Sequence, residues 1–235
     1  MNTLIIDIET IGEDWSKMDE TSQDVLTRWI KKESKDDGEY EVMLDELKDG
    51  LGFSPLTGEI VAIGMYDLER EKGCIYFQAP NETIPDFEEG VFKYKALDEK
   101  TMLAEFWKGA KEYDTFVTFN GRGFDAPFVA IRSMVHCVRP SRDLLSNRYT
   151  SLQRGCKHVD LLDQLSFYGA SRFKGSNLHM YCRALGIESP KAGGVAGDDV
   201  AGLFKAKEFA NIARYNAGDL IATAKVYERW IETLS

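Results

Sequence analysis

The chain has 235 residues, 43% of them hydrophobic, and a formal net charge of −10. This length can bury one sizeable core, and because no Pro- or Ser-rich linker divides the sequence we expect a single domain over residues 1–235. No apolar run reaches the roughly 20 residues of a membrane span, no secretory signal pattern opens the chain, and the four cysteines are scattered. We therefore expect a soluble, cytoplasmic protein without a zinc site or a disulfide framework.

The first predicted element is a strand over residues 3–12, an apolar run that contains two acids, Asp7 and Glu9. Side chains alternate between the two faces of a strand, so both carboxylates point to the same side. Two like charges side by side in a poorly solvated place raise the cost of ionising each other unless a cation lies between them. The strand therefore predicts a metal site that needs further oxygen ligands.

Residues 13–52 form a long polar segment with apolar residues at helical spacing. We predict a helical insertion here, with a polar turn around residues 36–38 between its helices. A segment of this length between the first two strands is either an ornament on the fold or a lid over the site. The sequence leaves both alternatives open.

The next elements alternate between strands and helices, which predicts an α/β fold with helices packed on a central sheet. The first two of these strands form a hairpin through a charged turn, and Asp98 or Thr101 can cap the helix that follows. Polar chemistry is expected where strands end. The predicted ranges are strands at 59–66, 73–78 and 115–119, a helix that begins near residue 98, a turn at 120–123 and a helix at 126–138.

The turn at 120–123 leads to Asp125 at the start of the second helix. A lone Asp there commonly caps free amides and interacts with the helix dipole. The two glycines beside Asn120 and Arg122 indicate instead a backbone that a ligand approaches closely. Both interpretations of Asp125 stay open on the local sequence alone.

The chain is predicted to end in a long helix over about residues 207–233, in which Tyr215 and Asp219 share one face because they lie four residues apart. A shorter capped helix at 176–186 precedes it. Lys191 begins a glycine-rich loop that is either a plain surface loop or a backbone close to a phosphate. Upstream of these elements, we interpret three further polar residues as structural or supporting: His158, Asp160 and Asp163.

The acids on these elements, with no cysteine or histidine among them, form a hard oxygen-ligand set suited to Mg²⁺ or Mn²⁺. The arrangement resembles the DEDD superfamily of 3′–5′ exonucleases, the DnaQ-like branch of the ribonuclease H-like fold. Its motifs are matched in order, DxE by Asp7 and Glu9, NxxxFD by Asn120, Phe124 and Asp125, and YxxxD by Tyr215 and Asp219. The histidine subtype has His where this chain has Arg214, so the tyrosine subtype fits. Within it, the chain resembles the proofreading exonuclease domain of family B DNA polymerases and its stand-alone relatives.

The resemblance implies a central mixed β-sheet flanked by helices and a site for two Mg²⁺ ions, which Mn²⁺ could replace. Asp7 would bridge both ions, Glu9 and Asp219 would bind the ion that holds the attacking water, and Asp125 would bind the other ion. Tyr215 would orient the water, because a neutral tyrosine is a poor base. Phe124 is either a core anchor or a contact to the terminal nucleotide. The expected substrate contacts are Thr10, Ile11, Asn120, Phe124 and Lys191.

The distribution of charge bears on the substrate. Residues 1–58 carry 15 acids against 6 Lys and Arg, whereas residues 126–157 carry 6 Lys and Arg against one acid. The basic segment is either a solvated face or a surface for phosphates. We expect sequence-independent hydrolysis from the 3′ end of single-stranded DNA, with a replication or repair polymerase as a partner.

Three alternatives compete with this function. An exoribonuclease would use the same chemistry on RNA, because the catalytic residues do not contact the 2′ hydroxyl. A catalytically weak nucleic-acid-binding or polymerase-associated module is disfavoured by the intact carboxylates, which are a liability in a mere binder. A metal-stabilised structural protein would explain neither Tyr215 nor the basic segment.

Overall fold

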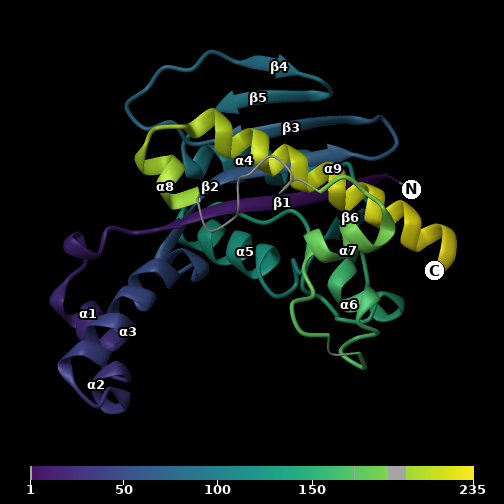
Figure 1. Cartoon of the computed structure of the whole chain (residues 1–235). Helices are drawn as coiled ribbons and strands as arrows, with labels where there is room; N and C mark the ends of the chain where they lie inside the picture. The colour runs from purple at the N-terminus through teal and green to yellow at the C-terminus, as the bar shows by residue number, and fades with distance from the viewer. Residues whose placement is uncertain (1, 172, 190–199) are drawn as a thin grey trace.

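The computed structural model describes residues 2–171, 173–189 and 200–235. Within these residues, seven strands form one mixed sheet in the order β4-β5-β3-β2-β1-β6-β7, with helices on both faces (Figure 1). The strands are β1 (Thr3–Gly12), β2 (Gly58–Asp67), β3 (Lys72–Phe77), β4 (Phe87–Glu89), β5 (Phe92–Ala96), β6 (Thr115–Thr118) and β7 (Lys157–Asp160). The helices are α1 (Glu20–Thr27), α2 (Ile30–Glu33), α3 (Asp37–Gly50), α4 (Glu99–Ala110), α5 (Asp125–Val135), α6 (Leu161–Leu165), α7 (Leu178–Leu185), α8 (Val200–Lys205) and α9 (Phe209–Thr233), with short 3₁₀ helices at Trp15–Lys17, Leu51–Phe53 and Thr150–Leu152. No helix among the described residues is long and apolar enough to cross a membrane.

Strand β1 lies near the middle of the sheet and has two kinds of neighbour. It pairs antiparallel with β2, which pairs antiparallel with β3, and it pairs parallel with β6, which pairs parallel with β7. The pairing of β1 with β6 covers only Thr3 to Ile5. Beyond Ile5 this pairing stops, and the backbone N–H of Ile8 donates to the Asp125 carboxylate instead. The edge strand β4 and its neighbour β5 were not predicted from the sequence.

The alternation of β1 divides its side chains between two hydrophobic cores. Ile5 packs in the core beneath α9, whereas Leu4, Ile6 and Ile8 pack in the core against α4 and α5. Asp7 follows the same alternation as Ile5 and so points to the α9 face of the sheet. Strand alternation thus directs the predicted metal ligands of β1 towards the last helix of the chain.

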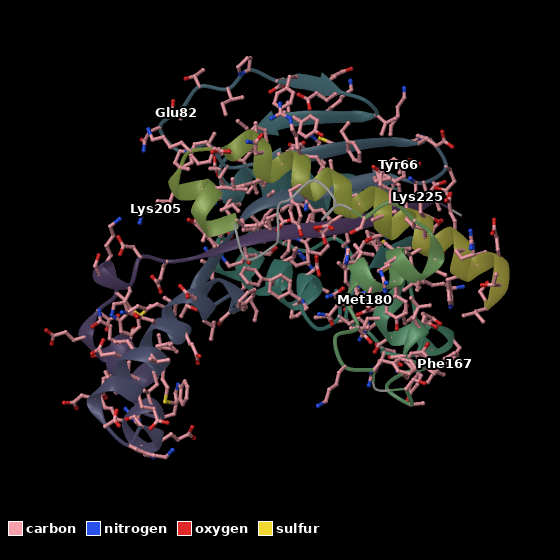
Figure 2. All side chains as sticks on the ribbon, viewed as in Figure 1. Tyr66, Glu82, Phe167, Met180, Lys205 and Lys225 are labelled. Carbon is pink, nitrogen blue, oxygen red and sulfur yellow. The ribbon has the colours of Figure 1, made fainter. Side chains whose placement is uncertain are left out.

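Two helices near the site have well-defined ends. Asn177 caps α7 by accepting a hydrogen bond from the backbone N–H of Met180, and Gly186 ends it with a φ of +68°. The neighbouring surface carries exposed apolar side chains, with Phe167 after α6 and Met180 on α7 visible in Figure 2. Helix α9 runs for 25 residues across the sheet and packs on β1, β2 and β3.

The predicted helices of residues 13–52 are present as α1, α2 and α3, and we call this segment the arm. Figure 1 shows these three helices extending away from the sheet. Asp19 and Asp36 cap α1 and α3 by accepting hydrogen bonds from backbone amides. The arm returns to the sheet at Gly52, whose carbonyl accepts a 2.7 Å hydrogen bond from the Thr10 hydroxyl. Only the base of the arm therefore lies beside the predicted site.

Candidate active site

Three of the four predicted metal ligands converge in space. Ligand oxygens of Asp7, Glu9 and Asp219 all lie within 4.8 Å of one another. Asp7 and Glu9 come from the same face of β1, and Asp219 comes from α9, which crosses that face. Glu9 is buried, while Asp7 and Asp219 are half-buried. The cluster joins residues that are more than 200 positions apart in the sequence.

Burial and mutual repulsion make this cluster difficult to ionise. Burial raises the pKa of Asp7 well above its usual value, and the charges of Asp125 and Glu9 raise it further. Burial also raises the pKa of Glu9, with the charge of Asp219 as the next cause. Among the described residues, no Lys, Arg or His forms an ion pair with Asp7 or Glu9. A donor set of close carboxylate oxygens without a cationic partner fits a hard divalent cation such as Mg²⁺ or Mn²⁺.

Asp125 lies beside this cluster and is bound to the backbone of β1. Its Oδ1 accepts a 3.1 Å hydrogen bond from the backbone N–H of Ile8, in the stretch where β6 no longer pairs with β1. Burial raises the pKa of Asp125 to about 7, although hydrogen bonds from backbone amides oppose this rise. Asp125 is therefore the first residue of α5, and its carboxylate also hydrogen-bonds to the backbone of β1. Its charge contributes to the raised pKa of Asp7.

Tyr215 lies one helical turn before Asp219 on α9 and lines the same pocket as Asp7 and Asp219. This pocket has a volume of about 150 Å³, and its other lining residues are Phe119, Asn177, Leu178 and His179. Burial raises the pKa of the Tyr215 hydroxyl, and the charges of Asp219 and Glu9 add to that shift. The hydroxyl thus stays protonated beside the carboxylates.

The turn before α5 is held by Asp160 at the end of β7. The Asp160 carboxylate accepts hydrogen bonds from the backbone N–H groups of Asn120 (2.8 Å), Arg122 (2.9 Å) and Leu162 (2.9 Å). Asn120 has a φ of +65°, a conformation that Asn adopts more readily than most residues. The supporting role expected for Asp160 is therefore visible as three hydrogen bonds that shape this turn.

The predicted substrate contacts lie in two places. Thr10 and Ile11 line a hollow of about 620 Å³ with the C-terminal end of α3, Phe53 and residues of α8. Phe124 is half-buried, with its ring centroid 5.4 Å from that of Phe128 in the core and 6.4 Å from that of Phe53, which is 65% exposed. Asn120 lies exposed at the turn. Lys191 lies outside the described residues.

The basic segment, residues 126–157, is less available to phosphates than its composition suggests. Arg132 makes a buried ion pair with Glu99 (2.6 Å), and Arg148 donates to the carboxylate of Asp163 (3.0 Å). The Arg142 guanidinium donates to the backbone carbonyls of Ala110 and Lys111. Three of its six cations therefore have partners within the protein.

Two residues of the site were not found from the sequence. Asn216, between the motif residues on α9, donates a 2.7 Å hydrogen bond from Nδ2 to Asp7 Oδ2. Hydrogen bonding from Asn216 lowers the pKa of both Asp7 and Glu9, against the larger effect of burial. His179 lines the pocket from the first turn of α7, where its Nδ1 lies 2.7 Å from Ser189 Oγ. The spacing of Asn216 and Asp219, three residues apart on one helix, was a usable signal for Asn216.

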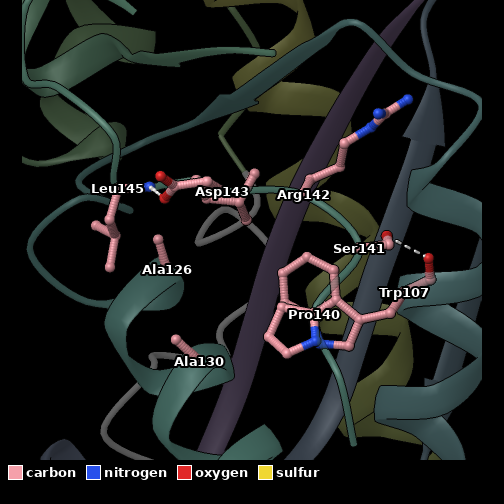
Figure 3. Close-up of a pocket in the computed structure, with 9 residues that line it drawn as sticks. Trp107, Ala126, Ala130, Pro140, Ser141, Arg142, Asp143 and Leu145 are labelled. Atoms are coloured by element: carbon pink, nitrogen blue, oxygen red, sulfur yellow. Dashed lines mark hydrogen bonds between the residues drawn. The ribbon is translucent and has the colours of Figure 1, made fainter. Parts of the chain in front are cut away.

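A second hollow, of about 390 Å³, lies on the α4 and α5 side of the fold (Figure 3). Trp107, Pro140 and Ala130 contribute to its wall, and the Ser141 hydroxyl donates to the Trp107 carbonyl at 2.6 Å. None of the predicted site residues that the structure describes lines this hollow. The carboxylate cluster of Asp7, Glu9 and Asp219 lies on the opposite face of the sheet, beneath α9.

The sheet order, its mixed pairing and the acidic site at the separation of β1 and β6 define a ribonuclease H-like α/β fold of the exonuclease type. Residues 81–233 match the model of a family described as a predicted 3′–5′ exonuclease related to the exonuclease domain of PolB, and the chain belongs to this family. The match contains the motifs with Asp125 and Asp219 and begins after β1.

Comparison with solved structures agrees with this assignment. The family B DNA polymerase from the hyperthermophilic archaeon Pyrobaculum calidifontis matches with a TM-score of 0.58 and 16% sequence identity. The match covers 98% of this chain and 24% of the polymerase chain, so this chain spans about a quarter of that protein. No curated protein matches the sequence. The predicted fold class and the predicted relationship are confirmed.

Proposed function

We propose that this protein is a metal-dependent exonuclease that hydrolyses phosphodiester bonds from the 3′ end of single-stranded DNA. The observation that carries the proposal is the convergence of Asp7, Glu9 and Asp219 within 4.8 Å, beside Asp125 and Tyr215, in a chain of this family. We propose that residues 1–235 act as one exonuclease domain, with the arm inserted in it. The family relationship also supports a polymerase as a partner.

The carboxylates would hold two Mg²⁺ ions, with Mn²⁺ as a substitute: Asp7 between the two, Glu9 and Asp219 on one and Asp125 on the other. Two divalent ions in such a site make a bound water nucleophilic and neutralise charge that develops on the phosphate. Tyr215 would orient the attacking water through its hydroxyl, because its raised pKa keeps it protonated and unable to act as a base. Glu9, buried at the same place, is our candidate for accepting the proton of that water.

The substrate strand would lie along the open side of the carboxylate cluster. Thr10 and Ile11 border the larger hollow, and Asn120 and Phe124 lie at the turn before α5. Lys191 remains part of this proposal as a phosphate contact. The exposed ring of Phe53, next to Phe124, offers a face on which a base could stack without being read. These contacts favour binding that is independent of base sequence.

The test is a time course on single-stranded DNA and RNA of the same sequence, each labelled at the 5′ end, with Mg²⁺, Mn²⁺ or a chelator. We expect a ladder of products shortening from the 3′ end, faster on DNA, and no products with the chelator. Faster shortening of RNA would show that RNA, and not DNA, is the preferred substrate. Binding of the oligonucleotides without metal-dependent cleavage would show a binding module instead.

A matched pair of variants separates the site from general effects of charge. Asp219→Asn removes one carboxylate of the cluster, whereas Glu228→Gln removes an exposed acid from the same helix. We expect the first variant to lose at least about 100-fold in cleavage rate, because a lost metal ligand removes charge stabilisation in the transition state. The second should cleave like the wild-type protein. Equal rates in Asp219→Asn and the wild type would disprove the assignment.

A further inference from the structure

Asn216 has an unusual place for a polar side chain. It is fully buried (0% exposed) on α9, between Tyr215 and Asp219 in the sequence. Its side chain is 2.7 Å from Asp7 Oδ2. Asn216 Nδ2 is the donor of this hydrogen bond, so the amide NH₂ group faces Asp7 and the amide oxygen faces away. The orientation of Asn216 is therefore set by Asp7.

This arrangement leaves the amide oxygen of Asn216 without a hydrogen-bond partner among the described residues. A buried acceptor that loses water and gains no donor costs free energy. An apolar side chain at position 216 would avoid that cost and would suit the core beneath α9. Packing therefore gives no reason for an amide at position 216, and its hydrogen bond to Asp7 does.

Gly64 on strand β2 leaves free the space that the Asn216 amide occupies. Gly64 is the cross-strand neighbour of Asp7, so a side chain at position 64 would project towards the same face of the sheet. A Cβ atom there would lie 1.9 Å from Asn216 Oδ1 and 2.7 Å from Leu220 Cδ1. The first distance is a severe clash with a side chain that is itself fixed. Gly64 therefore permits α9 to bring Asn216 onto Asp7.

The choice of a neutral donor also matters. A Lys or Arg at this place would form an ion pair with Asp7 and would occupy the electrostatic position of a cation. An amide fixes the direction of the carboxylate and adds no charge. The negative charge of the cluster then stays available for a cation, while the orientation of the Asp7 carboxylate is restrained.

We propose that Asn216 is a positioning residue that holds the Asp7 carboxylate in the orientation needed to bind a divalent cation, and that Gly64 is the glycine that makes this possible. The inference rests on the proposed function in one respect, that the carboxylate cluster is a metal site. Supporting hydrogen bonds to metal ligands typically contribute 10- to 100-fold in metal affinity. Asn216 would act in this way through Asp7.

The test is the affinity of the whole chain for Mn²⁺, measured by isothermal titration calorimetry without nucleic acid. We expect Asn216→Ala to raise the dissociation constant about 10- to 100-fold. The matched control is Asn211→Ala, which removes an exposed amide from the same helix. The side chain of Asn211 forms hydrogen bonds with Glu208 and Arg214. This control should bind Mn²⁺ as the wild-type protein does.

Gly64→Ala provides a second, independent variant. Its Cβ must displace the amide of Asn216, so we expect weaker Mn²⁺ binding, similar to that of Asn216→Ala. In the double variant the amide in the path of the new Cβ is gone, and the nearest remaining atom is the terminal Cδ1 of Leu220. Adding Gly64→Ala to Asn216→Ala should therefore change the Mn²⁺ affinity less than about two-fold. Circular dichroism shows which variants are folded. If Gly64→Ala does not fold, the Mn²⁺ affinity of Asn216→Ala alone tests the inference.

The outcomes separate this inference from the proposed function. Mn²⁺ binding by Asn216→Ala within two-fold of the wild type would overturn the inference, even if the wild type degrades DNA. Weaker binding by Asn216→Ala in a protein that degrades no nucleic acid would support the positioning role and contradict the proposed function. A wild-type protein that binds no Mn²⁺ would overturn both.

Discussion

His158 is a histidine that the fold keeps neutral in its interior. It is 1% exposed on β7, with Nδ1 2.8 Å from the carbonyl oxygen of Leu144 and Nε2 2.8 Å from Thr118 Oγ1. A carbonyl only accepts, so Nδ1 carries the proton and Nε2 accepts from the Thr118 hydroxyl. Burial lowers the pKa of His158 to about 4. Protonation would place a charge in the core and remove the acceptor for Thr118.

This lowered pKa makes the stability of the protein depend on pH. Below the unfolded pKa of 6.5, the unfolded chain takes up a proton that the folded protein does not, so stability falls as the pH falls from about 6.5 towards 4. With these two pKa values, the linkage relation gives a loss of about 2.5 kcal/mol between pH 7.5 and pH 4.5. The loss should be absent above pH 7.5.

The assay compares the wild-type protein with His158→Asn by urea unfolding at pH 7.5, 6.0 and 4.5. Asn keeps an amide donor for Leu144 but has no proton to gain. The buried carboxylates titrate in both proteins, so their effects cancel in the difference. The quantity compared is the unfolding free energy of the variant minus that of the wild type. We expect it to be about 2.5 kcal/mol higher at pH 4.5 than at pH 7.5. A difference that is constant over this pH range would show that His158 does not have a lowered pKa in the folded protein.

Two further predictions concern the site and its support. Tyr215→Phe should lower kcat about 10- to 100-fold and leave KM within about two-fold, because the hydroxyl orients water and does not hold the strand; a raised KM with unchanged kcat would contradict this role. Asp160→Asn should destabilise the protein by about 2 kcal/mol in urea unfolding, since an amide N–H₂ would face a backbone N–H that now donates to a carboxylate. An unchanged unfolding midpoint would show that the turn before α5 does not depend on Asp160.

Local periodicity was sufficient to predict much of the site. Alternation along β1 placed Asp7 and Glu9 on one face, and helical spacing in α9 placed Tyr215 near Asp219. The convergence of β1 and α9 could not follow from either pattern, because it depends on packing across the sheet. It was expected only through the resemblance to a known family.

Other features depend on contacts that a local pattern does not contain. The role of Asn216 requires Gly64 on a different element, 152 residues away. The basic segment looked like a free cationic face because the partner of Arg132, Glu99, lies 33 residues upstream. Strand β5 was missed although its residues alternate between buried and exposed, because the strand is only five residues long.

The proposed function depends above all on hydrolysis from the 3′ end at the carboxylate cluster. The most direct measurement is parallel digestion, with Mg²⁺, of one single-stranded DNA labelled at its 5′ end or at its 3′ end. We expect the 3′-labelled strand to release labelled mononucleotide at the earliest time points, while the 5′-labelled strand shortens stepwise. Release of the 5′ label first, or labelled fragments from internal cuts, would contradict it.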